Sequence, residues 1–259
     1  MKKLFRLLAV ATVVVASMTS GHAALFTNTF GTKLVGPSDC DDCFTGPIAF
    51  TGLGQSINFF GTTYSGLYVG SNGYVTFGDG SGAFSSRALN TEVILPMIAG
   101  SFTDLDSRSD GASNVYIDDT TPGQFIATWE SMGHFSFNYS VRSTFQLVIR
   151  SDQFLVAPGQ GQIGFFYGEI TDPSLTSAGF GDGLAAINPG EVAFLSLTDA
   201  TKLSNNQPRW FNLDGGAPTT ISAVPEPGSL ALFGLAVAGM GLMRRRSQAV
   251  KYSAKPALV

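Results

Sequence analysis

The chain has 259 residues, of which 44% are hydrophobic and 13% are charged, with 31 glycines and a formal net charge of −4 at pH 7. Between residues 24 and 224 it carries seven basic and eighteen acidic residues, a net charge near −11. A charge of this sign repels phosphate backbones and anionic membrane surfaces, which excludes nucleic acid as a partner of this region and leaves cations or basic surfaces as its charged partners.

The first 23 residues predict a helical secretory signal peptide. Three basic residues within the first six are followed by an apolar run over residues 7–16 and by the small residues Gly21 and Ala23. This order of a basic, an apolar and a small-residue region is typical of an export signal. We therefore expect cleavage between Ala23 and Ala24, with a retained membrane anchor as the alternative.

Cys40 and Cys43 are the only cysteines, and they lie in the segment 24–54 that precedes the predicted domain. Since an exported chain reaches an oxidising compartment, we expect a small disulfide loop. A redox pair would need a βαβ context, and a zinc site would need two further ligands. Free thiols are the remaining alternative.

Residues 55–215 predict strands joined by tight turns. Asn72-Gly73 lies between two short apolar runs, which is the strongest short signal for a β-hairpin. In residues 144–149 apolar and less apolar positions alternate, so one face of that strand is expected in the core and the other less buried. No stretch keeps apolar residues at helical spacing for three turns. The candidate strands are residues 56–60, 64–69, 74–77, 114–117, 124–129, 144–149, 162–167, 193–197 and 209–213, with an irregular apolar segment at 93–98.

This pattern predicts an all-β fold, a single β-sandwich-like domain of about ten strands. Its length of about 200 residues, from the signal peptide to the C-terminal motif, suffices for one sizeable core. Residues 216–223 are expected to be a linker.

Three stretches of the predicted domain resemble a known family. The first two are Phe59-Phe60-Gly61 and the run from Leu67 to Gly78. The third, from Phe102 to Arg108, is similar to that family's acidic turn. Together they resemble a nidogen-like (NIDO) extracellular domain over about residues 55 to 185. The resemblance implies a domain of adhesive and matrix proteins that has no established catalytic set.

A calcium site is the one cofactor that the sequence suggests. Asp104, Asp106 and Asp110 bring three carboxylates together within seven residues, and a hard cation such as calcium prefers oxygen ligands on a tight loop. Arg108 stands among them, and Gly111 falls two places late for the usual calcium loop. The alternative is an acidic turn in which Arg108 pairs with a neighbouring carboxylate.

Aromatic residues between positions 129 and 139 suggest a contact surface for sugar rings. Trp129 and Tyr139 are the candidate ligand contacts, with Phe135 and Phe137 between them, and core packing is the alternative role.

We expect no enzymatic activity. His134 is the only histidine beyond the signal peptide, and no nucleophile-elbow pattern accompanies it. Glu130 is the first candidate for a glycosidase carboxylate. The spacing to its partner carboxylate is determined by the three-dimensional fold and not by the sequence. The glycine pattern of residues 159–164 matches a dinucleotide motif in letters, but it continues as a predicted strand rather than a helix.

The C-terminal region combines a Pro-Glu-Pro sequence, an apolar run over residues 230–243 and a basic triplet. The run predicts a short membrane helix over 229–243, because prolines prevent a helix from entering on its N-terminal side and arginines flank its other end. A buried core helix is the alternative for a run this short. Residues 247–259 would form a cytoplasmic tail. The residues that define the pattern are Val224, Pro225, Glu226, Pro227, Gly228, Arg244, Arg245 and Arg246.

Residues 224–246 resemble the PEP-CTERM sorting signal. The resemblance implies processing by a membrane protease-transpeptidase called exosortase, with cleavage near the Pro-Glu-Pro. It also implies transient residence in the inner membrane, then delivery to the cell surface or extracellular matrix of a Gram-negative bacterium.

Three functions are compatible with these features. The first is a non-catalytic surface or matrix protein for adhesion or for exopolysaccharide and biofilm association. The second is a carbohydrate-binding module, and the third is an extracellular hydrolase.

Overall fold

The computed structural model describes residues 25–85, 89, 93–108, 111–170, 176–184, 193–195 and 209–220. Strands are the regular structure of these residues, so the predicted all-β class is confirmed. Within these ranges no helix has the length and apolar character needed to cross a bilayer. The predicted signal-peptide helix and the predicted helix over 229–243 lie outside the described residues.

Several of the described strands have only two or three residues. The predicted number of about ten strands therefore stays a prediction. In chain order they are β1 (Thr32–Lys33), β2 (Ile48–Ala49), β3 (Ile57–Phe59), β4 (Thr62–Tyr64), β5 (Gly66–Val69), β6 (Tyr74–Thr76), β7 (Met97–Phe102), β8 (Leu105–Asp106), β9 (Asn114–Asp118), β10 (Gln124–His134), β11 (Asn138–Arg150), β12 (Ile163–Tyr167), β13 (Ser177–Gly181), β14 (Ala193–Leu195), β15 (Arg209–Asp214) and β16 (Ala217–Thr220).

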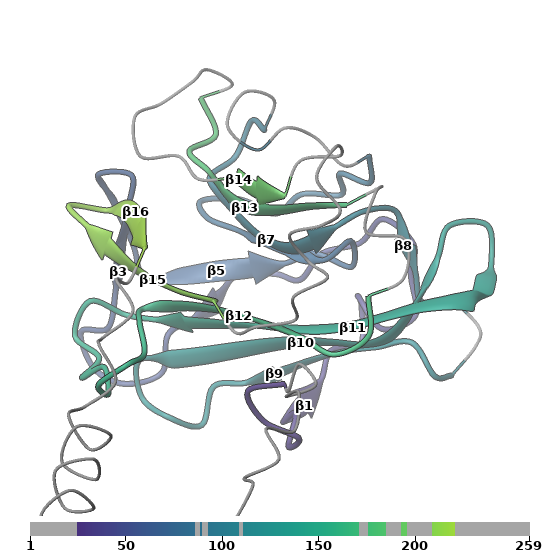
Figure 1. The fold of residues 1–259 in the computed structure, drawn as a ribbon, viewed down its shortest axis with the longest axis horizontal. Coiled ribbons are helices and arrows are strands. Elements are labelled where there is room, and N and C mark those ends of the chain that lie inside the picture. The colour runs from purple at the N-terminus through teal and green to yellow at the C-terminus, as the bar shows by residue number, and fades with distance from the viewer. Residues whose placement is uncertain are drawn as a thin grey trace, which may run out of the picture.

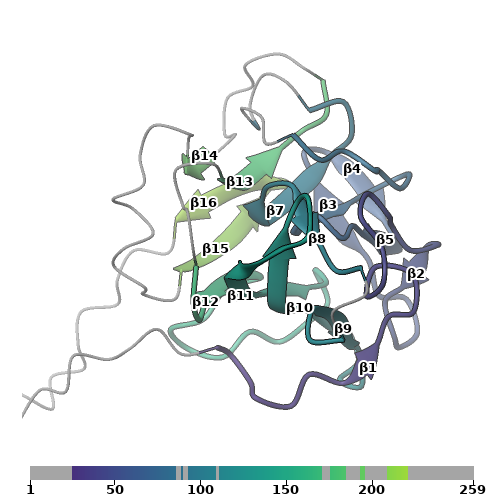
Figure 2. The ribbon, with the colours of Figure 1, turned by 90° about the vertical axis from the view of Figure 1, so that its right-hand side faces the viewer.

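Two antiparallel sheets lie face to face. The larger has the order β1-β9-β10-β11-β12-β15-β16, with β8 pairing on β10, and the smaller has the order β14-β13-β7-β6-β5-β2. Figure 1 shows β9 to β12 as one layer and β5, β7 and β13 as the layer above it. The hairpin β3–β4 forms a separate pair beside the smaller sheet (Figure 2).

The main core fills the space between the two layers. Phe145, Leu147 and Ile149 of β11 point into it, together with Ile98 of β7 and Phe180 of β13. These residues alternate along β11, as the sequence predicts, because successive side chains of a strand point to opposite faces.

The opposite face of β11 is more buried than its sequence suggests. Val148 is fully buried there and packs in a second cluster with Ile126 and Phe166, against which Phe26 and Trp210 lie. The expectation of a less buried face is therefore wrong, because the chain ahead of β1 and strand β15 cover it.

Pairing also extends beyond the predicted domain boundaries of 55 and 215. β1 pairs with β9 and β2 pairs with β5, although both precede residue 55. β16 pairs with β15 within the span that was expected to be a linker.

The predicted hairpin turn at Asn72-Gly73 joins β5 to β6, which pair in antiparallel register. Gly73 has a φ of +84°, and a Cβ at this position would lie 2.2 Å from the carbonyl oxygen of Ser101. Only glycine fits such a close approach. This turn therefore packs under β7 rather than projecting into solvent.

Candidate functional site

An acidic cluster lies where the disulfide loop meets the turn before β8. Cys40 and Cys43 form a disulfide with their Cα atoms 5.9 Å apart. The loop that it closes holds Asp41 and Asp42, and carboxylate oxygens of these two residues and Asp104 all lie within 4.8 Å of one another. The cluster thus joins residues more than sixty positions apart in the sequence.

Asp106 belongs to an ion pair rather than to this cluster. Its two carboxylate oxygens accept hydrogen bonds from Nε and Nη2 of Arg108 at 2.9 and 2.6 Å. Burial alone would raise the pKa of Asp106, but the hydrogen bonds from Arg108 outweigh it and hold the pKa below 3.8. Arg108 also lies 2.9 Å from Asp41. The predicted alternative, an acidic turn with a paired Arg108, describes Asp106 correctly.

The carboxyl group of Asp104 in this cluster has a raised pKa. Burial, followed by the negative charges of Asp42 and Asp41, raises the pKa of Asp104 to about 6. One oxygen of Asp104 and one of Asp41 are buried without a hydrogen-bond partner in the described structure. Carboxylates in this arrangement match the ligand preference of a hard cation.

The donor set that fits calcium therefore differs from the predicted one. Asp104 keeps its place, Asp41 and Asp42 join it, and Asp106 is engaged by Arg108. The predicted ligand Asp110 lies outside the described residues.

Asn72 positions this cluster, a role that the sequence did not reveal. Its side chain is fully buried, donates to a carboxylate oxygen of Asp42 at 2.9 Å and accepts from the backbone N–H of Leu105 at 2.8 Å. Asn72 appears in the sequence only as a turn residue. The signal that could have found it is the acidic pair at 41–42, since converging carboxylates require nearby donors.

Trp129 cannot contact a ligand in this structure, which corrects its assignment as a sugar-binding residue. Its side chain is fully buried, its Nε1 donates to the carbonyl oxygen of Gly70 at 2.9 Å, and its ring stacks on Phe145 at 5.0 Å. The physical reason is strand alternation, because this position of β10 faces the core between the sheets.

The exposed aromatics of the stretch from 129 to 139 lie instead at the tip of the β10–β11 hairpin. Phe135 and Phe137 have 56% and 55% of their surface exposed. The guanidinium of Arg108 lies 4.6 Å from the ring centre of Phe137. The hydroxyl of Tyr139 donates to the backbone oxygen of Arg108, so this half-buried tyrosine fixes the tip rather than presenting a free ring.

The two residues considered for hydrolysis lie along one strand, β10. Glu130 is in register with Asn114 of β9. Burial raises the pKa of Tyr116, and the nearby carboxylate of Glu130 raises it further. His134 is in register with Asn138 at the hairpin end.

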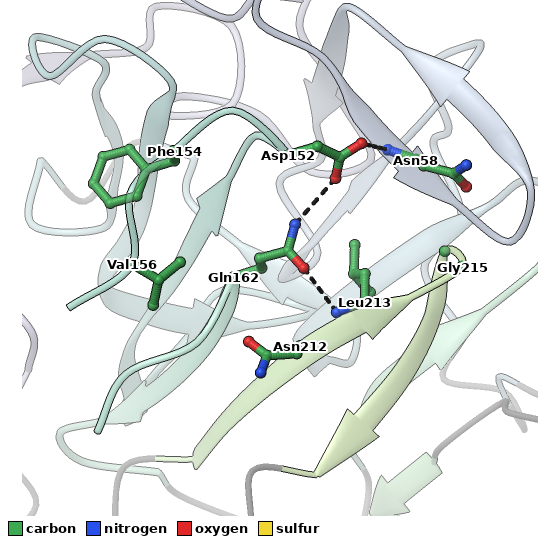
Figure 3. Close-up of a pocket in the computed structure, with 9 residues that line it drawn as sticks. Asn58, Asp152, Phe154, Val156, Gln162, Asn212, Leu213 and Gly215 are labelled. Carbon is green, nitrogen blue, oxygen red and sulfur yellow. Dashed lines mark hydrogen bonds between the residues drawn. The ribbon is translucent and has the colours of Figure 1, made fainter. Parts of the chain in front are cut away.

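A polar cleft of about 450 Å³ lies at the other end of β11 (Figure 3). Three parts of the chain form it: the β3–β4 hairpin, the connection from β11 to β12, and the β15–β16 hairpin. Its lining residues are Asn58, Asp152, Phe154, Val156, Gln162, Asn212, Leu213, Gly215 and Gly216.

Hydrogen bonds fix the polar side chains of this cleft. Asp152 accepts from the backbone N–H of Asn58 at 2.8 Å and from Nε2 of Gln162 at 3.0 Å. Gln162 in turn accepts from the backbone N–H of Leu213 at 2.8 Å. The chain of bonds, drawn in Figure 3, crosses all three parts of the wall. No feature of the sequence predicts this meeting, because the residues are spread over more than 150 positions.

The predicted sorting and cleavage residues lie outside the described residues. They are Ala23 and Ala24, Val224 to Gly228, and Arg244 to Arg246.

Comparison with known families confirms both resemblances. The family described as NIDO related matches residues 17–233, which is most of the chain. The PEP-CTERM protein-sorting motif matches residues 223–246. No curated protein and no solved structure matches.

Proposed function

The chain belongs to the NIDO-related family, and from this premise we propose that it is a non-catalytic surface or matrix protein that associates with exopolysaccharide. The observation that carries the proposal is the junction of two matches on one chain. An extracellular type of domain runs directly into a C-terminal sorting motif, so the chain is exported and sorted to the surface. The motif implies processing by exosortase.

The arrangement of charged groups supports a binding role rather than catalysis. Glycoside hydrolysis needs two carboxyl groups flanking the scissile bond. Among the described residues that line the polar cleft, Asp152 is the single carboxyl group. Glu130 and His134, the residues considered for hydrolysis, both lie on β10, and neither is among the described residues that line the cleft.

The charge of the domain supports a solvated position in the matrix. A net charge near −11 between residues 24 and 224 keeps chains apart and prevents adsorption to anionic membrane surfaces. Affinity for matrix components then has to come from local sites, such as the polar cleft and the exposed hairpin tip with Phe135 and Phe137.

Fractionation of the producing cells tests this function. The full chain is expressed with its sorting motif intact or with Pro225 and Pro227 both changed to alanine, and Pro158→Ala serves as a control in an exposed loop. We expect the intact chain to reach the extracellular matrix fraction and to be released when the exopolysaccharide is digested. The double variant should stay with the inner membrane, whereas Pro158→Ala should behave as the intact chain. Recovery of the intact chain with membranes only, or retention after complete digestion, would overturn the proposal.

A further inference from the structure

We infer that the polar cleft binds a chain of neutral sugar residues, which it recognises through adjacent hydroxyl groups. This inference rests on the proposed function and adds a site and a ligand class to it. A volume of about 450 Å³ lies within the usual range of small-molecule sites. The cleft opens to solvent, so a segment of a polymer can lie in it.

The cleft is fixed in shape before any ligand arrives. Gly216 has a φ of +90°, and a Cβ there would lie 2.2 Å from the side-chain oxygen of Asn58. The backbone N–H of Phe60 donates to the carbonyl oxygen of Gly216 at 2.8 Å. The turn between β15 and β16 is therefore docked on the β3–β4 hairpin, and little conformational entropy is lost when a ligand binds.

Asp152 supplies a fixed acceptor. Its backbone N–H donates to the carbonyl oxygen of Ser56 at 2.8 Å, and its two carboxylate oxygens each accept one of the hydrogen bonds from Asn58 and Gln162. A carboxylate has about four acceptor sites, so each oxygen keeps capacity for a further donor. Two adjacent hydroxyl groups of a sugar ring are spaced to donate to such a pair of oxygens.

Asn212 supplies both a donor and an acceptor. It is exposed on β15, and its side-chain amide lies on the cleft side of that strand (Figure 3). A sugar hydroxyl donates one hydrogen bond and accepts others, so an amide beside a carboxylate matches its needs. Ligands with only acceptor groups would find no complementary partner in Asp152.

Phe154 supplies an apolar surface on the same β11–β12 connection that carries Asp152. Its ring is half-buried and has the guanidinium of Arg150 4.8 Å from its centre, which holds the ring in place. Val156 lies next to it in Figure 3. The C–H face of a sugar ring packs on such a surface while its hydroxyls face the polar groups across the cleft.

Other ligand classes fit less well. An anionic polysaccharide would place its carboxylates or sulfates near Asp152 in an acidic domain, where repulsion disfavours them. A calcium ion takes about six to eight oxygen ligands, and among the described lining residues Asp152 is the one carboxylate that could supply them. Cleavage of the bound chain is disfavoured too, since a second carboxyl group is lacking among the described lining residues.

Affinity electrophoresis of the purified mature chain, residues 24–224, tests the inference. Native gels contain dextran, galactomannan or xylan as neutral probes and alginate as an anionic probe. We expect retardation by at least one neutral probe and none by alginate. Asn212→Ala and Asp152→Asn should each weaken that retardation about fivefold or more, because each removes polar contacts to the hydroxyls.

Matched controls separate binding from folding. Asp79→Asn makes the same charge change at an exposed position outside the cleft, and Asn28→Ala makes the same truncation at an exposed position ahead of β1. Both controls should bind as the parent does. Unchanged melting temperature in Asn212→Ala would show that its loss of binding is local.

Two results would overturn the inference. One is the absence of retardation by every neutral probe and by the exopolysaccharide of the producing cells. The other is full binding by both cleft variants. If the chain nevertheless fractionates with the matrix as proposed above, the surface function stands and only the assignment of this cleft fails. If it does not reach the matrix, the proposed function fails independently of the gel.

Discussion

The carboxyl group of Asp104 has a pKa well above its ordinary value. Burial and the neighbouring charges of Asp42 and Asp41 raise its pKa to about 6, from an ordinary value of 3.8. The folded state therefore holds this proton more tightly than the unfolded chain does. The contribution of Asp104 to stability is present below about pH 4 and is lost as the pH rises through 6.

The first prediction follows from this sign. Asp104→Asn should stabilise the domain by about 1 kcal/mol at pH 7.5, because the repulsion is removed and partial exposure screens its full size. The gain over the parent should shrink to nothing near pH 4. Thermal unfolding at both pH values measures it, with Asp79→Asn as an exposed control. A destabilised variant at pH 7.5 would contradict the account.

The second prediction concerns calcium at the same residues. Millimolar calcium should raise the melting temperature of residues 24–224, since it relieves the repulsion among Asp41, Asp42 and Asp104. Asp104→Asn should remove this response, whereas Asp152→Asn should retain it. No rise in the parent chain would reduce the cluster to a structural turn.

The third prediction concerns Trp129, which is core rather than contact surface. Trp129→Ala should destabilise the domain by about 3–5 kcal/mol, since it leaves a large cavity between the sheets. Trp129→Phe should cost about 1–3 kcal/mol, because the carbonyl oxygen of Gly70 loses its donor. Chemical denaturation measures both. Stability within 0.5 kcal/mol of the parent for Trp129→Ala, a change typical of surface sites, would contradict the assignment.

At the scale of elements, the disulfide loop places two carboxylates that no strand positions. Opening it should let Asp41 and Asp42 move away from Asp104. The fourth prediction is that Cys40→Ser combined with Cys43→Ser lowers the pKa of Asp104 below about 6, although burial keeps it above 3.8. A titration of carboxyl resonances by NMR measures it. An unchanged pKa would show that the loop keeps its shape without the bond.

The elements themselves were predictable where local pattern decides them. The Asn72-Gly73 hairpin, the core face of β11 and the strand after residue 162 follow from turn chemistry and period-two alternation. The buried outer face of Val148 was not predictable, because Phe26 and Trp210 reach it from distant parts of the chain. The sequence also did not predict the pairing of β1 with β9 or of β16 with β15, because such short edge strands have little pattern of their own.

The candidate sites escaped prediction for a related reason. The sequence indicated carboxylates near residue 104, but the disulfide loop brings in Asp41 and Asp42, and Arg108 removes Asp106. The cleft gathers Asn58, Asp152 and Asn212 because the β3–β4 hairpin docks on the β11–β12 connection and on the β15–β16 turn. Long-range strand pairing decides such meetings, and neither spacing nor composition records it.

At the scale of the whole molecule, the sandwich is one part of a chain whose C-terminal region carries a sorting motif. The NIDO-related match and the sorting motif overlap over residues 223–233, so the domain leads directly into its sorting signal. The described β-sandwich is therefore the domain that the C-terminal motif sorts.

The intact mass of the protein recovered from the surface or medium of its producing cells tests this central claim most directly. We expect a species that begins at Ala24 and ends near Pro225 to Pro227, with any added mass on its new C-terminus. A species that still carries residues 230–246 would contradict it, because the chain would then be a plain membrane-anchored protein and not a sorted one.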